Sequence, residues 1–301
     1  MNGLVAGVRS VDLGTTDLVR AAAFYAEVWS LERVAQTQSS IFLRGQGRYH
    51  HILGLHAYPQ PAILRLTLDV AGSDALHVLH ARIRDADLPV ADRIRPLMTP
   101  GGGEGFDSRD PEGRNISFAS GVADHPESQT VRPDRITKIT HLNLNSAAYE
   151  TMRQYMVGTL GFRVVDETRV NGFFNCGRDH HSIVIGRRDA PTLNHVAFEM
   201  PDLDSMMRMA GTMSEAGYPI EWGVGRHGPG NNVFAYFAGP EDMPIECTAE
   251  VLQIDDNYAY RGPEAWNFPP GRTDQWGVTG PPSARIKRIQ NMFRFADVSL
   301  R

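Results

Sequence analysis

The chain has 301 residues, about the length of two ordinary domains. It is 42% hydrophobic and 22% charged, carries a formal net charge of −5 and has no long run of Lys or Arg, which disfavours nucleic-acid binding. No apolar run reaches the roughly 18 residues of a spanning helix, the N-terminus lacks the pattern of a signal peptide, and the two cysteines cannot form a disulfide framework. We therefore expect a soluble, cytoplasmic protein that binds neither nucleic acid nor membrane.

The chain contains an internal repeat with an offset near 130 residues. The segment that starts at Val11 can be aligned with the one that starts at His141 (141 − 11 = 130), and LRLTLDV aligns with NHVAFEM at the same offset. The segment from Asp110, DPEGRNISF, matches GPEDMPIEC from Gly239 at an offset of 129. Several matches at one near-constant offset indicate a tandem duplication.

Each half of the duplication divides again into two strand–helix–strands units. In chain order the four units cover about residues 8–57, 62–119, 137–187 and 191–249. Residues 121–134 are rich in polar residues and Pro, as linkers are. We therefore predict an N-terminal domain over 1–120, a linker over 121–134 and a C-terminal domain over 135–250. The Gly- and Pro-rich tail, 251–301, is expected to wrap over the C-terminal domain.

The second half carries three residues that suit a metal ion. His141, His195 and Glu246 each lie in an expected strand, in HLNL, NHVAF and IECTA. A lone His in a strand is more often a hydrogen-bonded core residue, and a lone Glu at a strand end is usually solvated. The joint pattern favours ligands, because two His and one carboxylate leave open positions on a metal such as Fe(II). The first half lacks the set and has at the aligned positions Val11, Arg65 and Ser117.

Two further motifs surround these residues. CGRDHHS, 176–182, has the pattern CxxxHHS, and GRHGPGNNVFAYF, 225–237, contains a His and a Tyr ahead of Glu246. With the three ligands, these motifs resemble two-domain type I extradiol ring-cleavage dioxygenases of the vicinal-oxygen-chelate superfamily, over about residues 5–250. The resemblance implies an α+β fold of four βαβββ modules in two half-barrel domains. It also implies His141, His195 and Glu246 as metal ligands and His181, His227 and Tyr236 as catalytic residues.

The resemblance further implies the chemistry and the partners. We expect Fe(II), with Mn(II) as the alternative, and a catechol-type substrate, simple, substituted or bicyclic, whose ring is cleaved by inserting both atoms of O2. Such an enzyme would serve aromatic hydrocarbon catabolism, and a homo-oligomer is expected. We hypothesise that Asn143 and Asn194 orient the ligating imidazoles, since a ligating His usually donates its other N–H to such a group.

Two other classes of function stay open. One is a different metal enzyme on the same scaffold, such as a glyoxalase-like isomerase or a thiol transferase; the other is a non-catalytic binder of small molecules. Gly228, Pro229 and Gly230 after His227 depart from some biphenyl-diol members of the family and leave the substrate open. The remaining dense histidine cluster, in HHILGLHA, is expected to be an exposed or edge strand rather than a zinc site, and consists of His50, His51 and His56.

Overall fold

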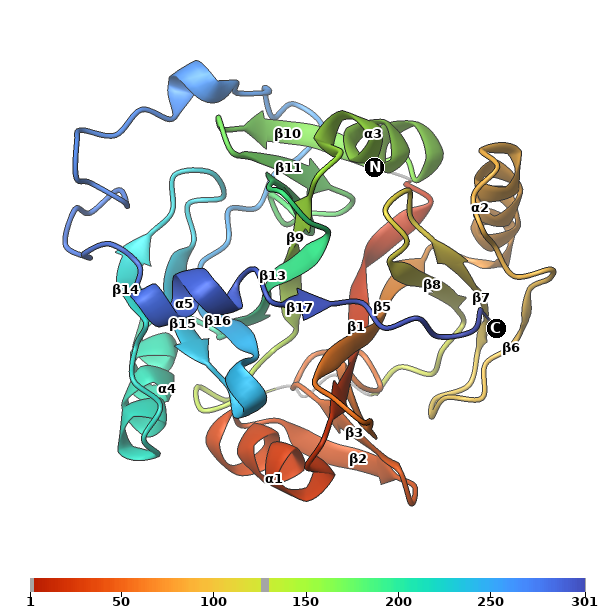
Figure 1. Cartoon of the computed structure of the whole chain (residues 1–301), viewed down its shortest axis with the longest axis horizontal. Coiled ribbons are helices and arrows are strands. Elements are labelled where there is room, and N and C mark those ends of the chain that lie inside the picture. Colours follow the sequence, from red (N-terminus) through yellow and green to blue (C-terminus); the bar gives the residue numbers. More distant parts are fainter. Residues whose placement is uncertain (1–2, 126–129, 301) are drawn as a thin grey trace.

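The computed structural model describes residues 3–125 and 130–300. Part of the linker predicted over 121–134, residues 126–129, lies outside the described residues, as do 1–2 and 301. The described residues form two mixed sheets, which Figure 1 shows as neighbouring units. We call the part built on the first sheet the N-terminal half and the part built on the second sheet the C-terminal half. The domain boundaries themselves stay a prediction.

The N-terminal half consists of two βαβββ modules joined in one sheet, with strand order β2-β3-β4-β1-β5-β8-β7-β6. Its first module contains β1 (Val5–Thr15), α1 (Leu18–Ala23) with the π-helical turn η1 (Phe24–Val28), β2 (Glu32–Gln36), β3 (Ser40–Arg44) and β4 (Leu53–Ala57). Its second module contains β5 (Ala62–Val70), α2 (Ser73–Asp85), β6 (Arg95–Pro96), β7 (Glu104–Arg109) and β8 (Asn115–Ser120).

The C-terminal half repeats this order as β10-β11-β12-β9-β13-β16-β15-β14. Its first module contains β9 (Ile139–Ser146), α3 (Tyr149–Gln154) with η2 (Tyr155–Thr159), β10 (Arg163–Glu167), β11 (Asn171–Asn175) and β12 (Ile183–Arg187). Its second module contains β13 (Thr192–Glu199), α4 (Leu203–Glu215), β14 (Trp222–Arg226), β15 (Val233–Ala238), η3 (Pro240–Asp242) and β16 (Pro244–Ala249). The four βαβββ modules and the α+β class are as predicted.

Local sequence explains the helices that cover the sheets. In α4, the Asp202 side chain accepts a hydrogen bond from the backbone N–H of Ser205 (2.7 Å), which caps the helix N-terminus. Met206, Met209 and Met213 follow at helical spacing and are all buried, so one face of α4 packs on the sheet. The corresponding helix α2 buries its own apolar face in the same way.

Strand pairing corrects the predicted alignment of the first strands by one residue. Val11 pairs with Leu66 as Leu142 pairs with Val196, so the offset between β1 and β9 is 142 − 11 = 131. The counterpart of His141 is therefore Ser10 (141 − 10 = 131) rather than Val11. Because side chains alternate along a strand, this shift changes the face, and Val11 belongs to the hydrophobic core.

The two halves are joined by core packing and by the end of the chain. Trp29 of the N-terminal half packs edge-on against Phe198 and Phe237 of the C-terminal half, with ring centroids 5.6 and 5.9 Å away. After η4 (Pro263–Ala265) and α5 (Ala284–Ile289), the strand β17 (Phe293–Arg294) pairs with β13. Phe295 then bridges to Ile63 of β5, so β17 runs from one sheet to the other (Figure 1). Among the described residues, no helix is long and apolar enough to cross a bilayer.

Candidate metal centre

Strand register brings the candidate ligands to one place. His141 on β9 faces Ala197 on β13, Ala197 faces Glu246 on β16, and Glu246 faces Tyr236 on β15. These four positions form one row across neighbouring strands. His195 lies two residues before Ala197, so its side chain is on the same face of β13. The duplicated half-barrel therefore gathers two imidazoles, a carboxylate and a phenol from four strands.

The ligand atoms of His141, His195 and Glu246 all lie within 4.8 Å of one another. The Nε2 atoms of the two histidines are 3.2 Å apart, and Oε2 of Glu246 lies 3.4 Å from His141 Nε2 and 3.0 Å from His195 Nε2. All three residues are buried, and within the described part of the chain Glu246 Oε2 has no partner that meets hydrogen-bond geometry. Three buried lone-pair donors that point at each other fit a divalent metal with open coordination positions.

One of the two predicted asparagines holds a candidate ligand in place. Nδ1 of His195 lies 2.8 Å from Oδ1 of Asn194, so this nitrogen carries the proton and Nε2 keeps its lone pair. Asn194 in turn donates from Nδ2 to Oδ1 of Asn145 (3.1 Å), which extends the network away from the site. The side-chain oxygen of Asn143, by contrast, is buried and has no hydrogen-bond partner in the described structure.

Asn232 is a polar contact of the site that the sequence analysis missed. Its Nδ2 donates to Oε1 of Glu246 (3.2 Å) and to Oγ1 of Thr248 (2.8 Å), and the residue is fully buried. It therefore holds one carboxylate oxygen while the other faces the histidines. Alternation could have revealed it, because Asn232, Phe234 and Tyr236 share one face of the same extended segment.

The three residues predicted to be catalytic surround the ligands. The ring of His181, in the turn before β12, lies with its centroid 4.4 Å from that of His141. His227, directly after β14, places Nε2 3.1 Å from the hydroxyl of Tyr236 and 4.0 Å from Oε1 of Glu246. The ring of Tyr236 packs edge-on against His195 at 5.0 Å. The structure thus brings all six predicted residues to one site.

Burial and the mutual contacts set the electrostatics of this site. Burial alone would raise the pKa of Glu246, but His141 and His195 hold it well below its usual range, so the carboxylate is ionised. Burial lowers the pKa of His195, although Glu246 acts in the opposite direction. Burial and then Glu246 raise the pKa of Tyr236 well above its usual value, so the phenol stays protonated.

The Gly-Pro-Gly sequence after His227 allows two close approaches. Gly230 has φ +79°, and a Cβ there would lie 2.7 Å from Cε1 of His181, so only glycine fits beside this ring. A Cβ on Gly228 would meet Trp266 of the tail at 2.9 Å. Gln275 of the tail also donates its side-chain amide to the backbone carbonyl of His227. The tail therefore contacts the segment that carries His227.

The equivalent place in the N-terminal half holds an ion-pair network. Arg65 occupies the position of His195 and lies 3.6 Å from Asp12 and 3.3 Å from Asp107. Nε2 of His56 lies 3.3 Å from Oδ1 of Asp12. Among the described residues, His141, His195 and Glu246 form the one group with metal-ligand geometry.

The expectation of an exposed or edge strand at residues 50–56 is wrong. The strand β4 lies between β3 and β1, inside the sheet, and His51 is buried with its ring edge-on to Phe42 (5.1 Å). The reason is the duplication: His51 is the counterpart of His181 (181 − 51 = 130) and shares its inward direction.

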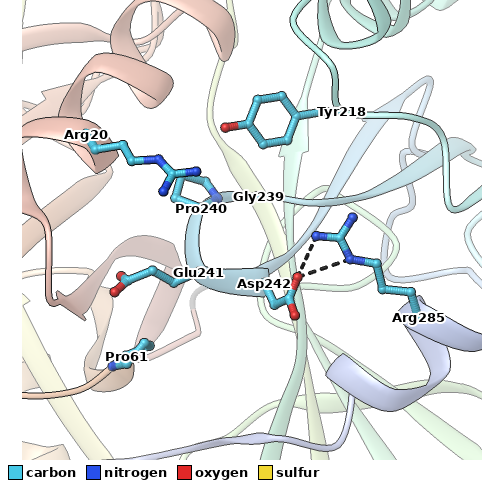
Figure 2. Close-up of a pocket in the computed structure, with 8 residues that line it drawn as sticks. All are labelled: Arg20, Pro61, Tyr218, Gly239, Pro240, Glu241, Asp242 and Arg285. Carbon is cyan, nitrogen blue, oxygen red and sulfur yellow. Dashed lines mark hydrogen bonds and ion pairs between the residues drawn. The ribbon is translucent and has the colours of Figure 1, made fainter.

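Two surface hollows in the described structure lie apart from this centre. One, of about 490 Å³, lies between the halves, and Figure 2 shows Asp242 in it paired with Arg285. Glu241 beside it accepts a hydrogen bond from the backbone N–H of Thr16 (3.0 Å), which ties the C-terminal half to the N-terminal half. The other, of about 620 Å³, is lined by Arg178 and residues 252–258. None of the six site residues lines either hollow.

Comparisons with known proteins agree with this site. A sequence model described as the glyoxalase/bleomycin resistance protein/dioxygenase superfamily matches residues 138–247, which span the three candidate ligands. The Mn(II)-bound glyoxalase from Novosphingobium aromaticivorans is 33% identical, with a TM-score of 0.88 and 94% of each chain covered.

Two curated relatives are similar at lower identity, and one of them is named as a dioxygenase. Metapyrocatechase 2 from Cupriavidus necator is 28% identical over 143 residues, 46% of this chain and 44% of that protein, so the match spans less than half of its length. A manganese-dependent 2,3-dihydroxybiphenyl 1,2-dioxygenase from Geobacillus genomosp. 3 is 22% identical over 80% of this chain and 83% of that protein. With four βαβββ modules and a His-His-Glu cluster on the C-terminal copy, the chain belongs to the glyoxalase/bleomycin resistance protein/dioxygenase superfamily.

Proposed function

We propose that this protein is an extradiol ring-cleavage dioxygenase that uses Fe(II), with Mn(II) as the alternative ion, and O2 to open a catechol-type ring. The observation that carries the proposal is the arrangement of His181, His227 and Tyr236 around the candidate ligands. An isomerase needs the metal and one base, whereas a reaction that binds a diol and O2 together uses several proton donors and acceptors. The relative named as a dioxygenase agrees with this choice.

In this proposal, the site residues have separate roles in metal binding and proton transfer. His141, His195 and Glu246 would hold the ion, which when bound supplies Lewis acidity toward the diol and redox chemistry toward O2. His181, in ring contact with His141, can take a proton from a substrate hydroxyl at Nε2. Tyr236, protonated because it is buried, can donate a hydrogen bond to a substrate oxygen. The apolar surroundings strengthen each of these hydrogen bonds.

The experiment is an oxygen-uptake assay on protein purified without air and loaded with Fe(II) or Mn(II). Simple, substituted and bicyclic catechols are added with O2, and a yellow product is expected to form with one O2 consumed per ring. His181→Gln and Tyr236→Phe are expected to lower kcat by about 10²–10⁴-fold while the metal content is retained. His77→Gln, on an exposed helix position, is the matched control. Metal-loaded protein that consumes no O2 with any diol would contradict the proposal.

A glyoxalase-like isomerase is the second candidate, because the relative that is 33% identical is called a glyoxalase. Such a reaction moves hydrogen within the substrate and consumes no O2. A hemithioacetal offered to the Mn(II)-loaded protein under argon tests it. Turnover without O2, together with no O2 uptake on catechols, would favour this candidate over ring cleavage.

A further inference from the structure

A buried carboxylate and a second histidine lie behind His181. Asp166 on β10 and His180 are both fully buried, and His180 Nε2 lies 2.9 Å from Oδ2 of Asp166. On the other edge of its ring, His180 Nδ1 lies 3.1 Å from Nδ1 of His181. These contacts form one chain, from Asp166 through His180 to His181, that ends beside the candidate ligand His141.

The donor and the acceptor of each of these two hydrogen bonds follow from which ring nitrogens can carry a hydrogen. A carboxylate only accepts, so His180 Nε2 must carry the hydrogen of the first bond. A neutral His180 then has a lone pair on Nδ1, and the second bond needs a hydrogen on Nδ1 of His181. This leaves Nε2 of His181 without a hydrogen, as a base requires.

Contacts from the tail balance the charge of Asp166. Arg261 places Nε 3.5 Å from Oδ1 of Asp166, and the hydroxyl of Tyr258 donates to the same carboxylate at 3.1–3.2 Å. The carboxylate of Asp166 is therefore paired with a guanidinium as well as hydrogen-bonded to His180.

The duplication supplies an internal comparison. His50 and His51 repeat the contact between ring nitrogens, with their Nδ1 atoms 3.2 Å apart. The counterpart of Asp166 is Ala35, which faces Phe42 as Asp166 faces Phe173 (166 − 35 = 173 − 42 = 131). The histidine pair is thus present in both halves, whereas the buried carboxylate is found in the half that has the metal-ligand geometry.

We propose that Asp166 and His180 are positioning residues that fix the ring orientation and the tautomer of His181, with the hydrogen on Nδ1 and the lone pair on Nε2. The proposal deepens the function proposed above, because it specifies how His181 is prepared to accept a proton. Neither residue touches the reacting atoms; both act through His181, as an aspartate acts through a histidine in a catalytic triad.

The test is heteronuclear NMR on the full-length protein, isotope-labelled at the imidazole nitrogens and loaded with diamagnetic Zn(II). The signals of His181 are identified by their loss in His181→Gln. The expected pattern is a single tautomer, protonated at Nδ1. Protonation of His181 at Nε2 in the unmodified protein would overturn the proposal, whatever reaction the protein catalyses.

Two variants test the chain of contacts independently. Asp166→Asn replaces the carboxylate by an amide that can donate or accept, and His180→Phe removes the connecting ring. Each is expected to leave His181 in a mixture of tautomers. If ring cleavage is the reaction, kcat falls by about 10–100-fold, with KM and metal content nearly unchanged. A single unchanged tautomer in both folded variants would show that Asp166 and His180 do not act on His181.

Two controls separate this effect from general damage. Tyr258→Phe removes a hydroxyl that donates to Asp166 and lies 3.2 Å from His180 Nε2, but it keeps the closer acceptor for His180, Oδ2 of Asp166, so the tautomer of His181 is expected to be unchanged. His50→Phe makes the same change as His180→Phe at the duplicated position, where the ring stacks on His125, and should not alter His181. A comparable loss of the single tautomer in His50→Phe would contradict the proposal.

Discussion

Arg65 on β5 occupies the place in the N-terminal half that His195 on β13 occupies in the C-terminal half. Its guanidinium lies between the carboxylates of Asp12 and Asp107, at 3.6 and 3.3 Å. The N-terminal half therefore has the guanidinium of Arg65 at this position. The C-terminal half has ligand atoms there whose lone pairs suit a metal cation. The same scaffold balances its inward charges in two different ways.

Replacing Arg65 tests this balance. Arg65→Met leaves Asp12 and Asp107 buried without their shared cation, so we expect the free energy of unfolding to fall by about 2–4 kcal/mol. Denaturant titration measures the change. The control Arg208→Met breaks a pair with Asp204 that is mostly exposed (67% and 71%), and should change stability by less than about 0.5 kcal/mol. Equal effects of the two substitutions would show that the network does not stabilise the N-terminal half.

The four modules could be predicted from the sequence because the strand and helix periodicities of the first half recur in the second half at one near-constant offset. Alternation along strands and helical spacing in α2 and α4 survive substitution, so four βαβββ units could be predicted. The exact register between β1 and β9 could not be predicted from the sequence. The turn between β3 and β4 is one residue longer than that between β11 and β12 (residues 45–52 against 176–182), and the weak similarity around Val11 hides the shift. The pairings of β1 with β5 and with β4 show that Ser10 is the counterpart of His141.

The site could be predicted only in part for a related reason. His141, His195 and Glu246 could be predicted because two histidines and a carboxylate within strands form a known type of metal-ligand set. Asn232 and Asp166 are ordinary polar residues in sequence. Alternation places Asn232 on the same face as Tyr236, but the contacts of Asn232 with Glu246 and of Asp166 with His180 are seen only in the structure. The tail residue Tyr258 contacts Asp166 from 92 positions away in the chain, and it lies beyond the repeat that located the three candidate ligands.

Metal addition provides a prediction that does not depend on the reaction. Mn(II) at a thousandfold excess over its Kd should stabilise the unmodified protein by about 4 kcal/mol, because the unfolded chain has no such site. His195→Ala should abolish the increase in Tm, since one of three ligands is lost. His77→Ala, on the exposed side of α2, should retain it. Thermal melts with and without the ion are the measurement; an undiminished shift in His195→Ala would exclude His195 as a ligand.

Gly230→Ala tests the close approach to His181. The substitution adds backbone strain at φ +79° and places a methyl 2.7 Å from the His181 ring, so the ring must move. Gly217→Ala adds the strain alone, because Gly217 has φ +83° and no neighbouring atom of the described residues lies within 4 Å of its Cβ position. We expect Gly230→Ala to lose about 1 kcal/mol more stability than Gly217→Ala and to lower kcat while the metal content is retained. Equal stability and equal turnover of the two variants would mean that His181 tolerates the added methyl.

His51 should make stability depend on pH. Burial, the largest cause, lowers the pKa of His51 from its usual value near 6.5 to about 4, although Asp12 acts in the opposite direction. Between pH 6.5 and 4 the unfolded chain therefore binds a proton that the folded chain does not, and stability is lost as the pH falls through this range.

Replacing the imidazole isolates this contribution from those of the carboxylates. The stability of the unmodified protein relative to His51→Gln should fall by up to about 3 kcal/mol from pH 7 to pH 4, because each unit of pKa shift corresponds to about 1.4 kcal/mol. Unfolding by denaturant at several pH values gives both curves. His77→Gln, at an exposed position of α2, serves as the control. Parallel curves for His51→Gln and the unmodified protein would show that the His51 ring takes up its proton in the folded protein as readily as in the unfolded chain.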